Sequence, residues 1–158
     1  MKRITRLVFL AAFACAVALP AAALAGDEVP LRGSDQGSWG LGTHNCGALL
    51  PVFVADSGAA THLGRYAYSS QECANLAAGT YAGSFTMTAA SGDTVTGTYA
   101  GTFTVDAAGT IHYEQTNTIT GGTGRFASAS GTFALSGLAF ANGDCAQELS
   151  GAISRVGG

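Results

Sequence analysis

The stretch TVTGTYAGTFTV, residues 94–105, combines glycine, threonine and a bulky apolar residue in a short phrase that recurs along the chain. The phrase returns at residues 79–81, 109–111 and 131–133. Threonine and aromatic residues favour the pleated, half-buried surface of a β-strand, and glycine inside a sheet marks a turn, a bulge or a close backbone approach. The repeat therefore predicts a succession of strands.

Apolar residues and threonine alternate in this part of the chain. Within residues 94–105 the odd positions carry Val, Gly, Tyr, Gly, Phe and Val, nearly all even positions carry Thr, and residues 80–89 alternate similarly. A period of two gives each strand one apolar face and one wet face. The connections at residues 91–93 and 107–109 are too short for parallel crossovers, so neighbouring strands should run antiparallel.

The number of such segments predicts the architecture. About seven or eight strands and almost no helical periodicity favour an all-β fold, an antiparallel up-and-down barrel of about eight strands, with a β-sandwich as the alternative. We expect strands at residues 49–55 and 59–69, a turn between them at 56–58, and a loop or short helix at 71–78. The apolar positions change parity after Gly137, which predicts a β-bulge there.

The first 25 residues have the organisation of a secretory signal peptide. Positive residues within the first six positions precede an apolar stretch at residues 7–19, and Ala23-Leu24-Ala25 supplies the small-residue pattern of a cleavage site. The apolar stretch is short for a membrane span, so no stable membrane anchor is expected. We predict a signal peptide at 1–25, an N-terminal arm at 26–48, a β-barrel domain at 49–158, and a secreted or periplasmic location.

Charge argues against two classes of partner. Three of the seven Lys and Arg residues lie in the predicted signal peptide, so four Arg remain against ten acidic residues, a formal charge of −6, and no lysine is left. An acidic, lysine-free surface offers no electrostatic footprint for nucleic acid or for anionic lipid. We therefore expect no nucleic-acid partner.

Three cysteines remain after the predicted signal peptide: Cys46, Cys73 and Cys145. In an oxidising compartment this number predicts one disulfide and one free thiol, but the sequence does not say which two residues pair. The spacing of His44 and Cys46 lacks the second close pair of a zinc site, so no metal is expected. No cofactor is expected either, because the lysine of a phosphate-binding P-loop is missing.

Three stretches of sequence resemble a known group of barrels. Residues 121–127 read GGTGRFA, residues 129–133 read ASGTF, and residues 60–66 read ATHLGRY. With these motifs, residues 50–156 resemble the allene oxide cyclase-like barrel superfamily, which includes the plant dirigent proteins, and within it small secreted bacterial members. The resemblance implies an eight-stranded antiparallel barrel with an apolar cavity, assembled as a homo-oligomer, a dimer or a trimer.

The resemblance leaves the activity open. The plant cyclase and the dirigent proteins steer a reactive small molecule mostly by confining it. The catalytic polar residues of the cyclase have no counterparts that can be placed on this chain, so no catalytic residue is assigned. Whether the protein is an enzyme is uncertain from the sequence.

The strand expected at residues 110–120 breaks the apolar pattern of its inner face. Its odd positions carry Ile111, Tyr113, Gln115, Asn117 and Ile119. Buried amides cost free energy unless they are hydrogen-bonded. Gln115 and Asn117 therefore either orient a ligand in a cavity beside Tyr99 and Tyr113, or bond to each other, to a tyrosine hydroxyl or to a trapped water.

The ligand-binding candidates are Tyr99, Tyr113, Gln115, Asn117 and His62. His62 is included because it should share a strand face with Tyr66 and Tyr68, with a hydrogen-bonded core histidine as the alternative. His112 and Glu114 fall on the threonine face, where no pocket serves acid–base chemistry. The block at residues 121–126 is expected to be a tight glycine connection with one helical turn, and its Phe126 to plug the barrel end.

Together these patterns favour an exported barrel that binds a small apolar or amphipathic ligand in its interior. The alternatives are a cyclase- or dirigent-like enzyme that acts by confinement, and a structural or interaction protein with a solidly packed barrel. The volume of the interior separates the last hypothesis from the other two, because a solid interior packs at the density of an organic crystal.

Overall fold

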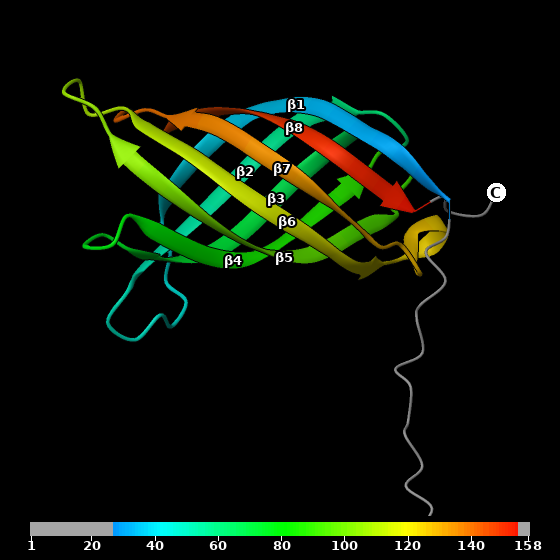
Figure 1. The fold of residues 1–158 in the computed structure, drawn as a ribbon, viewed down its shortest axis with the longest axis horizontal. Coiled ribbons are helices and arrows are strands. Elements are labelled where there is room, and N and C mark those ends of the chain that lie inside the picture. Colours follow the sequence, from blue (N-terminus) through cyan, green and yellow to red (C-terminus); the bar gives the residue numbers. More distant parts are fainter. Residues whose placement is uncertain (1–26, 155–158) are drawn as a thin grey trace, which may run out of the picture.

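Eight strands close into a barrel in this computed structural model, which describes residues 27–154 (Figure 1). Each strand pairs antiparallel with the next, and β8 pairs with β1, so the predicted up-and-down barrel is confirmed. The predicted signal peptide lies outside the described residues. The strands are β1 (Glu28–Leu41), β2 (Leu50–Ala60), β3 (Gly64–Asn75), β4 (Thr80–Ala89), β5 (Thr94–Val105), β6 (Ile111–Gly122), β7 (Gly131–Ala139) and β8 (Asp144–Ser154).

The segment expected as an N-terminal arm is a barrel strand. β1 pairs with β2 from Gly33↔Ala60 to Leu41↔Val52, and with β8 from Glu28↔Ser154 to Ser38↔Asp144. The barrel therefore begins near residue 28 and not at residue 49. The alternating pattern of this strand was not recognised in the sequence. Its inner positions include two glycines, Gly33 and Gly37, and a carboxylate, Asp35, in place of bulky apolar residues.

The turn expected at residues 56–58 lies inside β2. Asp56 faces the interior there, and Gly58 packs so closely on β1 that an added Cβ would lie 2.1 Å from the carbonyl oxygen of Ser34. The chain turns instead at residues 61–63, where His62 has φ +65° and Gly64 has φ +72°. β3 then continues to Asn75, so the loop or helix expected from residue 71 was placed too early.

The bulge expected at Gly137 is absent from the pairing of β6 with β7, which runs without a shift from Ile111↔Ala139 to Ile119↔Gly131. Leu138 simply points outward and is partly exposed. Gly137 is needed because the ring of Tyr113 covers it, and an added Cβ would lie 2.5 Å from the tyrosine hydroxyl. The register shift lies instead between β5 and β6, at Thr96 and Gly97.

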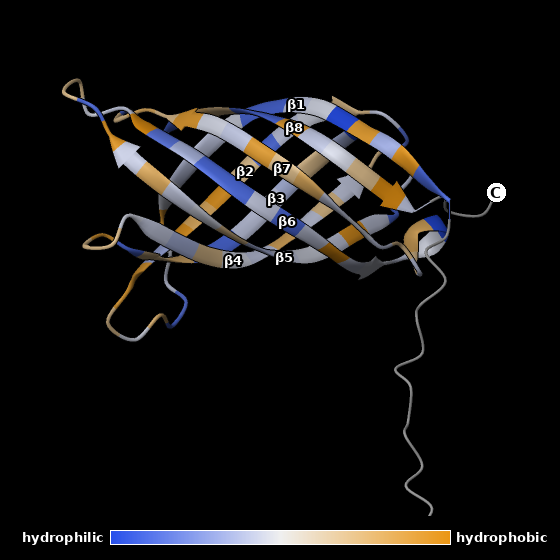
Figure 2. Ribbon diagram, in the orientation of Figure 1, coloured by the Kyte–Doolittle hydropathy of each residue, from blue (hydrophilic) through white to orange (hydrophobic). Residues whose placement is uncertain are grey.

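One end of the barrel is closed by the connection between β6 and β7. This connection holds a short 3-10 helix, η1 (Gly124–Phe126), and Phe126 is 0% exposed and belongs to the core cluster that also includes Leu31, Val95 and Ile153. The expected plug is therefore confirmed. Apolar and hydrophilic residues alternate along the strands that lead to it (Figure 2), as a barrel with one packed face requires.

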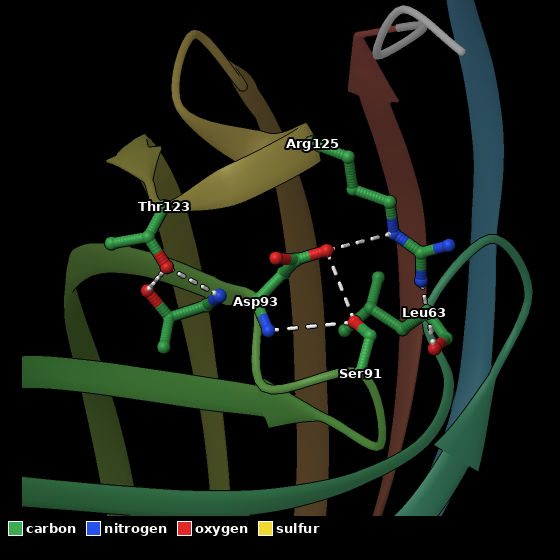
Figure 3. Close-up of polar contacts among 6 residues, drawn as sticks. Leu63, Ser91, Asp93, Thr123 and Arg125 are labelled. Carbon is green, nitrogen blue, oxygen red and sulfur yellow. Dashed lines mark hydrogen bonds and ion pairs between the residues drawn. The ribbon is translucent and has the colours of Figure 1, made fainter.

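Polar contacts hold this plug in place. The guanidinium of Arg125 donates to the carbonyl oxygen of Leu63 at 3.3 Å and lies 3.9 Å from the carboxylate of Asp93 (Figure 3). Its Cζ also lies 4.6 Å from the centre of the Phe126 ring, a cation–π contact. The block at residues 121–126 thus joins three connections at one end of the barrel and is a structural closure.

No helix in the described part of the chain is long and apolar enough to cross a membrane.

Candidate functional site

A cavity of about 250 Å³ occupies the half of the barrel opposite the plug. Its outermost lining residues are Leu41, the last residue of β1, and Leu76, which directly follows β3, and each is 66% exposed. The cavity therefore opens at the end that carries the β1–β2 and β3–β4 connections. Apolar residues form this mouth: Trp39, Leu41, Leu50, Leu76, Ile111 and Ala139. The cavity is therefore a one-ended pocket with an apolar entrance.

Polar side chains gather at the inner part of the same cavity. Ser70 and Glu72 come from β3, Gln115 from β6 and Gln147 from β8. Three tyrosines, Tyr68, Tyr81 and Tyr113, line it as well. An apolar wall with a few convergent polar groups is the usual composition of a small-molecule site.

A larger hollow, of about 1220 Å³, lies on the outer wall of the barrel. Its side-chain lining includes the exposed residues Ser34, Gln36, Thr102, Thr104, Glu114 and Glu148. This hollow is open to solvent and its lining mixes outer-wall residues with inner ones such as Tyr66 and Tyr113, so it offers no enclosed space. The interior cavity is the better candidate, because it is more enclosed and the buried polar residues Ser70 and Gln115 line it.

The two inner amides form a chain of hydrogen bonds. Tyr81 donates to Gln115 Oε1 at 3.0 Å, Gln115 Nε2 donates to Asn117 Oδ1 at 2.8 Å, and Asn117 Nδ2 donates to the carbonyl oxygen of Phe133 at 3.3 Å. Gln115 lines the cavity, whereas Asn117 is fully buried below it. Of the alternatives left open by the sequence, the amides therefore bond to each other and to a tyrosine hydroxyl.

The predicted tyrosines lie inside the barrel. Tyr113 lines the cavity and donates to Gln147 Oε1 at 3.0 Å. Tyr99 is buried and donates to Glu72 Oε2 at 2.7 Å, so it acts on the cavity through Glu72. The structure thus brings together four of the five predicted site residues.

His62 is the exception. It lies in the β2–β3 turn at the closed end and is exposed, away from the cavity lining. The prediction was wrong because it extended the strand through the turn and so gave His62 the same face as Tyr66. His112 lies on the outer wall, as expected, 3.1 Å from Asp106 Oδ2.

Three carboxyl groups of the interior were not predicted from the sequence: Asp35, Asp56 and Glu72. Tyr66 donates to Asp35 Oδ2, while Cys145 and Gln147 Nε2 donate to the two oxygens of Asp56 at 3.1 and 2.9 Å. Glu72 was assigned to a loop, and Asp56 to a turn, because both stand in segments with turn-like composition. Correct strand limits would have placed Glu72 on the inner face with Tyr66 and Tyr68.

Burial raises the pKa of all three carboxyl groups. Desolvation is the main cause for each, and the pKa of Asp56 rises to about 6, with repulsion from Asp35 as an additional cause. Among residues 27–154 the arginines are exposed and the histidines lie on turns or the outer wall. No arginine of this described range faces the three interior acids, and His44, from the β1–β2 loop, offsets only part of the rise in the pKa of Glu72.

Two buried polar atoms have no hydrogen-bond partner in the described part of the chain: Asp35 Oδ1 and Ser70 Oγ. Ser70 is 6% exposed and lines the cavity, one inner position from Glu72. A buried hydroxyl without a partner costs free energy. It therefore marks a position in the cavity where a bound group can donate or accept a hydrogen bond.

The cysteines pair as Cys46 with Cys73, and Cys145 is a buried free thiol. His44 lies close to this disulfide, and its ring Nε2 donates to the carbonyl oxygen of Glu72 at 2.9 Å. The disulfide joins the β1–β2 loop to β3 beside the mouth. Its sulfur atoms are bonded to each other, so they do not serve as the thiolate ligands that a zinc site needs.

Comparison of the chain with models of known families, with curated proteins and with solved structures found no match. The resemblance to the allene oxide cyclase-like barrels therefore stays a prediction from the motifs at residues 60–66 and 121–133.

Proposed function

We propose that this protein is an exported binding barrel that holds a small amphipathic molecule in its interior. The observation that carries the proposal is the one-ended cavity, which combines an apolar mouth with a polar inner part. Export rests on the signal-peptide pattern of residues 1–25.

The size of the cavity limits the ligand. Its volume of about 250 Å³ is just under the range of roughly 300–1,000 Å³ typical of ligand pockets. The cavity therefore suits a small head group with a short apolar tail directed to the mouth. Exposed apolar residues near that mouth, Leu41, Leu76, Val105 and Phe140, provide further surface for such a tail.

A second candidate is an enzyme of the cyclase or dirigent kind, which shapes a reactive substrate by confinement. The observation in its favour is Asp56, whose pKa of about 6 is suitable for a general acid or base near neutral pH. Asp56 stands behind Gln147 and Cys145 and does not line the cavity itself. The geometry therefore favours binding over catalysis.

The test is native mass spectrometry of protein purified from its own host, combined with thermal shifts against a panel of short amphiphiles. We expect a retained small molecule, or a rise in melting temperature with at least one member of the panel. Protein that is always empty and unresponsive to the panel contradicts the binding function. A ligand that is released chemically altered favours the enzyme.

A further inference from the structure

We propose that the cavity selects a primary ammonium head group, with Glu72 as its charge partner and Ser70 Oγ as a further hydrogen-bond acceptor. The inference rests on the proposed binding function and adds the chemical class of the ligand.

The first argument is the imbalance of interior charge. Asp35, Asp56 and Glu72 face the barrel interior, and no arginine of residues 27–154 faces it. His44 is the one basic side chain that acts on Glu72 in this range, and its ring lies outside the cavity lining, bonded to the carbonyl oxygen of Glu72. The two ion pairs within this described range, Asp106 with His112 and Asp93 with Arg125, leave all three interior acids out. An anionic ligand would enter a site that already holds uncompensated acids, whereas a cation supplies the missing partner.

The second argument is the position of Glu72 within the cavity. One of its oxygens, Oε2, accepts a hydrogen bond from Tyr99, and Glu72 is half-buried where it lines the cavity. The other oxygen has no partner among the protein hydrogen bonds to its side chain. Glu72 can therefore accept a further donor from the cavity side while Tyr99 holds its carboxylate in place.

The third argument is the unpartnered hydroxyl of Ser70. It stands two residues before Glu72 on the same strand face, is 6% exposed and lines the same cavity. An ammonium group has three N–H donors and no acceptor. It can thus donate to the free oxygen of Glu72 and to Ser70 Oγ together, which satisfies both atoms.

Aromatic rings complete this environment. The ring centre of Tyr81 lies 6.0 Å from that of Tyr99 and 6.3 Å from that of Phe103, and Tyr68 and Tyr113 line the same cavity. Aromatic rings around a carboxylate attract organic cations through their π-faces. Glu72 is the single carboxylate in the lining, and the surrounding walls are largely apolar. A hard metal ion, which needs six or more oxygen ligands, fits this lining poorly.

The experiment compares three ligands of matched length by isothermal titration: hexylamine, 1-hexanol and hexanoate. We expect hexylamine to bind about ten- to a hundredfold more tightly than hexanol, as a hydrogen-bonded charge pair does relative to a neutral contact. Hexanoate should bind most weakly. Equal affinities for the three ligands overturn the ammonium proposal but are consistent with the binding function. If none of the three ligands binds, the ammonium proposal is overturned and the binding function is contradicted as well.

The variant Glu72→Gln tests the role of the charge, since it keeps the shape and an acceptor oxygen. We expect the preference for hexylamine over hexanol to fall to within about threefold, because the charge-assisted contact is gone. Glu114→Gln is the matched control, because it removes the same charge from the exposed outer face of β6. If Glu72→Gln keeps the original preference for hexylamine over hexanol, the proposal is overturned. If that variant does not fold, the comparison of the three ligands on the unmodified protein is the deciding test.

Discussion

Replacing Phe126 by alanine should lower the free energy of unfolding by about 3–5 kcal/mol, the usual cost of removing a buried aromatic ring from a core. The ring is fully buried at the closed end of the barrel, where it packs within the core cluster that includes Leu31 and Ile153. Because the plug covers this core, its loss also admits water to the barrel interior. Urea unfolding followed by circular dichroism measures the change as a lower midpoint.

Phe140→Ala is the control for this substitution. The same ring is removed there from a site that is 38% exposed, at the β7–β8 turn near the open mouth. We expect its effect to stay below about 1 kcal/mol, as for other substitutions at exposed positions. Equal losses in the two variants would contradict the assignment of Phe126 as the plug.

Stability should fall as the pH rises from about 4 to about 7. The pKa of Asp56 is about 6 in the folded protein and 3.8 in its reference state, so the folded protein holds this proton more tightly than the unfolded chain does. The unfolded chain loses this proton at a lower pH than the folded protein does, so the free energy of unfolding falls as the pH rises through this window. The raised pKa values of Asp35 and Glu72 act in the same direction.

Asp56→Asn tests this pH dependence, because it removes the ionisable group and keeps an oxygen that accepts from Gln147. We expect the variant to be more stable than the original protein at pH 8 and to show a flatter profile between pH 4 and pH 8 in urea unfolding. Glu148→Gln, on the exposed outer face of β8, is the matched control and should keep the original slope. A slope that is the same in Asp56→Asn as in the original protein contradicts the account.

The fold could be predicted from the sequence where strands keep strict alternation. β4 and β5 were recognised because aromatic residues and threonine alternate in them. Gly92 and Gly109 indicated the turns that follow these strands. β1 was missed because it places glycine and Asp35 where a core strand usually has bulky apolar residues. Small residues on the inner face of β1 allow the neighbouring strands to approach closely. A prediction that looks for bulky apolar residues at alternate positions does not detect such a strand.

The site was predicted in part for the same reason. Tyr113 and Gln115 were found because they lie in a strand with clear alternation, where an amide stands out. Glu72 was not predicted as a site residue because the strand that carries it was expected to end before residue 71. An acidic residue in a loop is expected to be exposed to solvent. The contact of Asp35 with Asp56 depends on the pairing of β1 with β2, and such long-range register is absent from local sequence patterns.

Trp39 offers the most direct test of the central claim, that the interior cavity holds a small amphipathic molecule. It is the single tryptophan of the chain, it lines the cavity mouth, and its indole Nε1 donates to the carbonyl oxygen of Phe140 at 3.0 Å. A ligand that enters the cavity must therefore change the surroundings of this one fluorophore.

The measurement is the emission of Trp39 during titration with hexylamine, in the original protein and in Ala74→Phe, whose new ring fills the cavity from the inner face of β3. Ala67→Phe, on the exposed outer face of the same strand, is the control. Circular dichroism and melting temperature confirm that both variants fold. The account predicts a saturable change in the original protein and in Ala67→Phe that disappears in Ala74→Phe. A signal that is unchanged in the original protein, or that persists in Ala74→Phe, contradicts it.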